Sequence, residues 1–117
     1  MAKMKGDNGG NKSIKDECDA FVASAKVAVV AKSWCPYCTK AVKLLNGIVN
    51  DKQDIKVWNI DGEAANKTSD IQAYMKKITG ASSVPRVFIN GKILGGCDDT
   101  VALNKKGKLK SLIYAKI

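Results

Sequence analysis

Two cysteines separated by two residues, Cys35-Pro36-Tyr37-Cys38, carry the chemistry that this sequence indicates most directly. They closely follow an apolar run, Val27 to Ala31, and open a segment with a helical pattern. At such a junction the first thiol faces unpaired backbone N–H groups and the positive end of the helix dipole, which favour its thiolate. The thiolate is the nucleophile of disulfide exchange. The motif therefore predicts redox chemistry at Cys35, with Cys38 within reach to close an internal disulfide.

A close pair of cysteines can also be half of a zinc site. The chain has no histidine, so an all-cysteine site would need Cys18 and Cys97 as well. Those two do not form a second close pair, and we expect no bound metal. Cys18 is expected to be a small buried apolar residue on the first helix, and Cys97 a structural thiol.

Length and composition are typical of one globular domain. The chain has 117 residues, 45% of them hydrophobic, and no apolar run approaches the roughly 18 residues of a membrane span. Residues 1–12 are rich in Lys, Gly and Asn, lack the apolar core of a secretory signal, and are expected to be disordered. We expect a cytoplasmic location, where a reducing environment keeps cysteines from forming a structural framework.

The net charge of +9 comes mostly from lysines in the body of the chain. No motif of a nucleic-acid-binding module accompanies them, so we expect a solvated basic face and no nucleic-acid partner. Such a face could still steer small anionic substrates. A cluster near the C-terminus consists of Lys105, Lys106, Lys108, Lys110 and Lys116.

The order of predicted elements indicates an α/β fold in residues 13–117. Apolar periodicity, caps and turn signals place helices at 13–25, 36–46 and 68–79, one or two helices across 98–117, and strands at 27–31, 55–60, 87–89 and 92–94. Ser13 and Thr68 or Ser69 are the expected helix caps, and Asn90-Gly91 the hairpin turn. A βαβ unit followed by a hairpin predicts a mixed four-stranded sheet with helices on its faces.

Taken together, three motifs resemble a dithiol glutaredoxin of the Cys-Pro-Tyr-Cys type. They are Cys35-Pro36-Tyr37-Cys38, the stretch Ser83-Val84-Pro85-Arg86-Val87-Phe88-Ile89, and Gly95-Gly96-Cys97-Asp98-Asp99. The resemblance covers about residues 14–115. It implies a thioredoxin-like fold with about five helices, and the reduction of protein disulfides and of mixed disulfides with glutathione. Electrons would come from glutathione, which glutathione reductase keeps reduced.

The resemblance assigns roles to residues at the thiols. Cys35 would be the nucleophile that retains glutathione as a mixed disulfide, and Cys38 the resolving thiol. The cation of Lys32 could stabilise the thiolate and hold a carboxylate of glutathione. Tyr37 could pack against the tripeptide, and Trp34 could shield the site or simply pack.

Further glutathione-binding residues follow from the other motifs. Val84-Pro85 resembles a cis-proline segment that presents the Val84 backbone to an extended peptide, and Arg86 could be a surface charge. The start of the helix at Cys97 suits the γ-glutamyl carboxylate, and Asp98 suits its ammonium. Thr68 and Gln72 could contact the glycine end.

Two other functions remain open at this point. One is a thioredoxin reduced by a flavoprotein, and the other is an iron–sulfur carrier whose cluster is bridged by glutathione. Pro36 should stiffen the loop and disfavour a cluster. The expectation is a monomeric enzyme with glutathione as co-substrate, no tightly bound cofactor, and no nucleic-acid or membrane partner.

Overall fold

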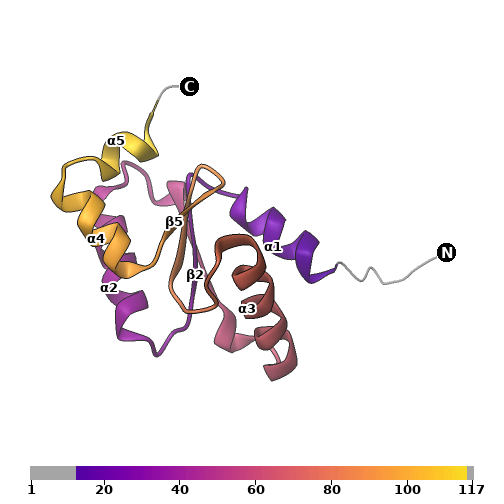
Figure 1. The fold of residues 1–117 in the computed structure, drawn as a ribbon. Helices are drawn as coiled ribbons and strands as arrows, with labels where there is room; N and C mark the ends of the chain where they lie inside the picture. Colours follow the sequence, from indigo (N-terminus) through magenta and orange to yellow (C-terminus); the bar gives the residue numbers. More distant parts are fainter. Residues whose placement is uncertain (1–12, 116–117) are drawn as a thin grey trace.

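A four-stranded sheet with the order β3-β2-β4-β5 forms the centre of the molecule (Figure 1). The structure is a computed structural model and describes residues 13–115. The predicted disorder of residues 1–12, and the end of the predicted C-terminal helix with Lys116, lie outside the described residues. The strands are β2 (Val27–Ala31), β3 (Ile55–Asn59), β4 (Arg86–Ile89) and β5 (Lys92–Gly95). The helices are α1 (Ile14–Val22), α2 (Pro36–Ile48), α3 (Ala65–Thr79), α4 (Cys97–Lys105) and α5 (Leu109–Ile113), with short 3-10 turns at η1 (Lys52–Asp54) and η2 (Ile60–Gly62).

The pairing of the strands confirms the predicted mixed sheet. Strand β2 pairs with β3 in parallel, with Val27 opposite Ile55, and with β4 antiparallel, with Val27 opposite Ile89. Strands β4 and β5 form the predicted hairpin. Asn90 and Gly91 both have positive φ angles, of 51° and 82°, which suits a tight hairpin turn.

Helices cover both faces of the sheet, so β2 is buried along its whole length (Figure 1). Val27, Val29 and Ala31 belong to the core beneath α2 and α5, together with Leu45 and Leu109. Ala28 and Val30 belong to the opposite core, beneath α1 and α3. A strand buried on both faces needs apolar residues at every position, which explains the continuous apolar run in the sequence.

The predicted helix boundaries are partly wrong. Helix α1 ends at Val22 rather than Ala25, whereas its cap is confirmed, because the Ser13 Oγ accepts a hydrogen bond from the Asp16 N–H at 3.1 Å. Helix α2 continues past Asn46 to Ile48 with Gly47 inside it. Gly80, in the left-handed region at φ 88°, ends α3 as expected.

The start of α3 is a clear correction. The helix begins at Ala65, so Thr68 lies in its first turn instead of capping it. The Thr68 hydroxyl donates to the carbonyl oxygens of Ile60 at 2.7 Å and Ala64 at 3.2 Å. The hydroxyl thus ties α3 to the turn after β3, a role that a cap prediction from local sequence does not capture.

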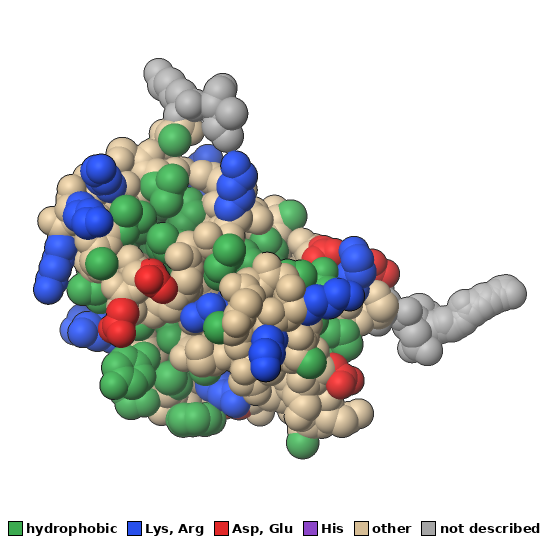
Figure 2. Space-filling model, viewed as in Figure 1, with side chains coloured by type: hydrophobic (Ala, Val, Ile, Leu, Met, Phe, Trp, Pro, Cys, Tyr) green, Lys and Arg blue, Asp and Glu red, His purple; other side chains and the backbone are tan. Residues whose placement is uncertain are grey.

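Basic side chains gather along the edge of the molecule formed by α4 and α5 (Figure 2). Lys105, Lys106, Lys108 and Lys110 are all exposed there, which agrees with the expected solvated face. Separately, no helix within residues 13–115 is long and apolar enough to cross a membrane.

Candidate active site

The two thiols lie where the sequence predicts, at the start of α2. Cys35 is the N-cap residue, with extended backbone at φ −84° and ψ 118°, and Pro36 occupies the first helical position. Proline suits that position because its missing N–H would have no partner within the helix. Cys38 lies one turn further in and is 2% exposed, compared with 7% for Cys35.

Cys35 is the more acidic of the two thiols. Burial raises the pKa of Cys35, but hydrogen bonds to its sulfur from the backbone and thiol of Cys38 and from the backbone of Tyr37, with the charge of Lys32, outweigh burial. The net pKa of Cys35 is therefore below its ordinary value. Hydrogen bonds to the charged form of a thiol favour the thiolate, so the site stabilises the thiolate form of Cys35.

Cys38 and Cys97 differ from Cys35 in this respect. Burial, together with its hydrogen bond to Cys35 and the charge of that residue, raises the pKa of Cys38 to about 11. Burial also raises the pKa of the Cys97 thiol, and the charges of Asp98 and Cys35 add to this effect. Among Cys35, Cys38 and Cys97, Cys35 is therefore the residue that loses its proton most easily.

The loop before Cys35 is held by a contact that the sequence did not reveal. Asp61, in η2, accepts a hydrogen bond from the Ser33 N–H at 2.9 Å and another from the Ser33 hydroxyl. These bonds keep the pKa of Asp61 below its usual range. Ser33 and Asp61 are 28 residues apart, so no local pattern could link them.

Exposed aromatic rings flank the thiols. Trp34 is 68% exposed and Tyr37 is 63% exposed. The Lys32 Nζ lies 5.6 Å from the centre of the Trp34 ring, a cation–π distance. The two exposed rings therefore form apolar surface beside the thiols.

A cavity of about 260 Å³ adjoins the thiols on the side of α4. It brings together five of the eight predicted glutathione-binding residues, whereas Lys32 lines a different groove. The lining residues are Tyr37, Ser83, Val84, Pro85, Arg86, Gly96, Cys97, Asp98 and Asp99. The peptide bond between Val84 and Pro85 is cis, as expected. Three segments far apart in the sequence therefore meet at one place.

The glycine pair shapes the wall of this cavity. Gly95 has a φ of 138°, and a Cβ there would lie 2.1 Å from the Asp99 Oδ2. That oxygen accepts the Gly96 N–H at 3.0 Å and so satisfies a donor at the start of α4. The first turn of α4 is therefore held close to the Gly95-Gly96 backbone. Within that turn Cys97 is buried and Asp98 is exposed.

Thr68 and Gln72 are not among the residues that line this cavity. The Gln72 amide donates to the Ser82 carbonyl oxygen at 2.9 Å, and Thr68 bonds within the chain as described above. Arg86, expected as a surface charge, is instead only 9% exposed and lines the cavity, which corrects that expectation.

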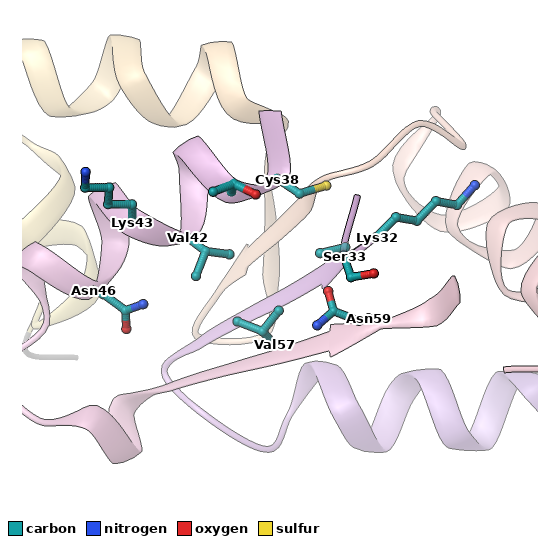
Figure 3. A pocket seen from close by; sticks show the side chains of 10 residues that line it. Lys32, Ser33, Cys38, Val42, Lys43, Asn46, Val57 and Asn59 are labelled. Atoms are coloured by element: carbon teal, nitrogen blue, oxygen red, sulfur yellow. The ribbon is translucent and has the colours of Figure 1, made fainter. Parts of the chain in front are cut away.

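A second groove, of about 420 Å³, opens on the other side of Cys38, between α2 and β3 (Figure 3). Val42 of α2 and Val57 of β3 line its middle, while Lys32 and Lys43 stand at opposite ends. Cys38, the second cysteine of the pair, also lines this groove. Cys18 lies in the core on the opposite face of the sheet, so the structure does not gather all four cysteines.

A four-stranded mixed sheet with a Cys-x-x-Cys pair at a helix start and a neighbouring cis-proline defines a thioredoxin-fold dithiol protein. Residues 27–94 match the family model described as glutaredoxin. Glutaredoxin-C6 of Oryza sativa subsp. japonica is 46% identical over 92 residues, which cover 79% of this chain and 78% of that protein. The chain belongs to the glutaredoxin family.

Solved structures agree with this assignment. The crystal structure of oxidized glutaredoxin 2 from Chlamydomonas reinhardtii is 42% identical, with a TM-score of 0.76 over 86% of this chain and 91% of that one. The crystal structure of the buckwheat glutaredoxin-glutathione complex is 30% identical, with a TM-score of 0.78 over 86% of this chain and 87% of that one.

Proposed function

We propose that this chain is a glutathione-dependent thiol–disulfide oxidoreductase in which Cys35 is the nucleophile and Cys38 the resolving thiol. The observation that carries the proposal is the asymmetry between two adjacent thiols. The pKa of Cys35 lies below its ordinary value, while that of Cys38 is raised to about 11. Cys35 is thus suited to attack as a thiolate, whereas Cys38 keeps its proton until the second step.

With a protein–glutathione mixed disulfide, only Cys35 is needed. Its thiolate attacks the glutathione sulfur, a Cys35–glutathione disulfide forms, and the protein leaves as a thiolate that takes a proton. A second glutathione, as thiolate, then attacks the glutathione sulfur of that disulfide. Oxidised glutathione is released and Cys35 returns as the thiolate that the start of α2 favours.

With a protein disulfide, Cys38 completes the reaction. Cys35 first forms a mixed disulfide with the protein, which removes the negative charge from Cys35. That charge, and the hydrogen bond between the two thiols, are among the causes that raise the pKa of Cys38. Their loss lowers the pKa of Cys38, which can then lose its proton and attack the Cys35 sulfur. The product is a Cys35–Cys38 disulfide and a released substrate dithiol, and two glutathiones reduce the enzyme disulfide.

Glutathione binding is proposed along the cavity beside α4, with the glutathione complex of the buckwheat relative as support. Tyr37, Val84 and Pro85 would contact the peptide, and Cys97 and Asp98 the γ-glutamyl end. Lys32 would bind the glycine carboxylate from the opposite side of the thiols. Thr68 and Gln72 remain proposed supports for that end of the peptide.

The finer features of the proposal are a monomeric enzyme formed by residues 13–117, glutathione as co-substrate without a tightly bound cofactor, and a cytoplasmic location. Its partners are glutathione and disulfide-containing or glutathionylated proteins, and glutathione reductase acts only through glutathione. A reaction that consumes reduced glutathione requires a compartment that regenerates it, which supports the location.

The direct test is turnover of a glutathionylated protein with glutathione and glutathione reductase as the only reducing system. Wild-type protein should be active, Cys35→Ser inactive, and the control Cys18→Ala active, because Cys18 is buried in the core on the other face of the sheet. Activity that requires a flavoprotein thioredoxin reductase, or an active Cys35→Ser variant, would refute the proposal.

A further inference from the structure

Strand β3 lies at an edge of the sheet and is paired along one side. In the strand order β3-β2-β4-β5, its neighbour within residues 13–115 is β2. The backbone N–H and C=O groups on the outer side of β3 therefore have no strand partner in that part of the chain. An edge of this kind can pair with an extended segment of another polypeptide.

The sheet is hollowed on both faces beside this edge. The groove between α2 and β3 (Figure 3), called here the α2-side groove, has a counterpart on the face covered by α1, called here the α1-side hollow. Each has a volume of about 420 Å³, and Val57, which is 38% exposed, lines both. Successive side chains of a strand point to opposite faces of a sheet. A strand added beside β3 would therefore direct alternate side chains into the groove and the hollow.

The α2-side groove favours acidic side chains. Lys32 stands at its end near the thiols, and the exposed Lys43 stands at its far end (Figure 3). The lining residues, all within residues 13–115, include these two lysines and no Asp or Glu. Val42 and Val57 lie between the two charges. An acidic segment is therefore attracted to this groove, and a basic segment is repelled.

The α1-side hollow instead suits apolar side chains. The rings of Phe21 and Trp58 line it, with their centres 5.4 Å apart. The Trp58 Nε1–H already donates to Glu63 Oε2 at 3.0 Å, and Glu17, which also lines the hollow, pairs with Lys67 at 3.1 Å. These polar groups have partners, which leaves the ring faces for apolar contact.

The α2-side groove is continuous with the thiols. Its wall on α2 runs from Cys38 to Asn46, eight positions further on, which is about 12 Å along a helix. An extended chain covers that length in about four residues. A polypeptide whose cysteine has reacted with Cys35 can thus continue along β3 and place an acidic residue beside Lys43.

We propose that the outer edge of β3 binds an extended acidic segment of the protein substrate as an added strand. Its acidic side chains occupy the α2-side groove, and the alternate, apolar side chains occupy the α1-side hollow. The inference rests on the function proposed above, because it names the class of protein that the enzyme reduces. The segment lies about four residues from the substrate's reactive cysteine.

The test is a nuclear magnetic resonance titration of the ¹⁵N-labelled protein with peptides that cannot react. Each peptide has serine in place of the reactive cysteine, flanked on both sides by alternating glutamate and valine or by alternating lysine and valine. The glutamate peptide should shift the amide signals of β3 and should bind about tenfold more tightly than the lysine peptide. Lys43→Glu should abolish or reverse this preference. Lys105→Glu, at an exposed position of α4, changes the net charge equally and should keep it.

A second pair of peptides tests the strand pairing. Because alternate N–H groups of a strand face the same neighbour, methylating the backbone nitrogens of only the glutamates or only the valines should abolish binding in one case and spare it in the other. Equal effects of the two methylations would overturn the proposal. It is also overturned by the absence of binding at millimolar peptide, by equal affinity for the glutamate and lysine peptides, or by a preference that Lys105→Glu removes as fully as Lys43→Glu.

Folding and function are separated from these outcomes. The amide spectrum of Lys43→Glu itself shows whether that variant is folded, and Lys43→Gln, which should lose part of the preference, decides if it is not. The titration uses no thiol chemistry, so its failure leaves the turnover assay of the proposed function standing. A protein that binds the glutamate peptide but does not turn over glutathionylated protein would refute the proposed function instead.

Discussion

The amide N–H of Cys35 donates to the carbonyl oxygen of Lys32 at 3.1 Å. The bond closes a turn between the two residues, and the charge of Lys32 is one of the causes that lower the pKa of Cys35. The same lysine lies against the Trp34 ring, which limits its freedom. One short turn therefore links backbone geometry, charge and reactivity.

Removing this charge should make Cys35 less acidic. In Lys32→Met the pKa of Cys35 should rise, so alkylation by iodoacetamide at neutral pH should slow about threefold, as expected for one solvent-screened charge. The thiolate is the form that reacts, so the alkylation rate increases with pH and levels off above the pKa of Cys35. A higher pKa of Cys35 therefore lowers the rate at neutral pH. Lys32→Arg should keep the wild-type pH profile. A Lys32→Met profile that matches wild type would show that the hydrogen bonds around the sulfur set its acidity alone.

Asp98 should matter for affinity more than for chemistry. If it binds the ammonium of the γ-glutamyl group, Asp98→Ala loses a charge-assisted hydrogen bond, and the apparent KM for glutathione disulfides should rise about tenfold. The turnover at saturating substrate should change less, because the contact is made before and during the reaction. Thermal unfolding of the variant reports any loss of helix stability separately. Unchanged kinetics would show that Asp98 does not bind glutathione and serves only in the first turn of α4.

Two glycine substitutions should have opposite effects on stability. In Gly95→Ala the new methyl group would overlap Asp99, at a φ of 138° that other residues rarely adopt, so we expect a loss of about 1–3 kcal/mol. Gly47→Ala is the matched change, because no atom outside the local helix backbone lies within 4 Å of the new Cβ and the residue is inside α2. It should stabilise the protein by about 0.5–1 kcal/mol. Denaturant unfolding measures the free energy of unfolding of both variants. An unchanged stability in Gly95→Ala would show that the first turn of α4 can shift to make room for the methyl group.

Cys38 should be needed for one class of substrate only. Cys38→Ser should still reduce protein–glutathione mixed disulfides, because that exchange uses a single enzyme thiol. Reduction of a protein disulfide by the two-thiol route should be lost, because no internal thiol resolves the intermediate. Parallel assays of the two substrates check this division. An equal loss of both activities would indicate that Cys38 acts mainly through its hydrogen bond to Cys35.

The parts of the fold and site that depend on local sequence were predictable. The Cys-x-x-Cys pair at a strand-to-helix junction, the apolar β2 and the Asn90-Gly91 turn each carry their signal within a few residues, and the structure confirms them. The contact of Thr68 with Ile60 was not predictable, because a hydroxyl near a helix start suits a cap equally well.

Long-range relationships account for the other differences. Asp61 anchors Ser33 across 28 residues, and no spacing rule connects them. Arg86 reads as a surface charge because most arginines are exposed. Arg86 is buried in the structure, where α4 contacts β4. The sequence of β4 alone does not show this contact.

The proposed mechanism requires that the sulfur of Cys35 is the first to carry glutathione. Cys38→Ser protein, exposed to oxidised glutathione and then digested without reductant, can be mapped by mass spectrometry. We expect one glutathione per chain, on Cys35, and no adduct in a second variant that carries both Cys38→Ser and Cys35→Ser. Glutathione found first on Cys97 or Cys18, with Cys35 unmodified, would contradict it.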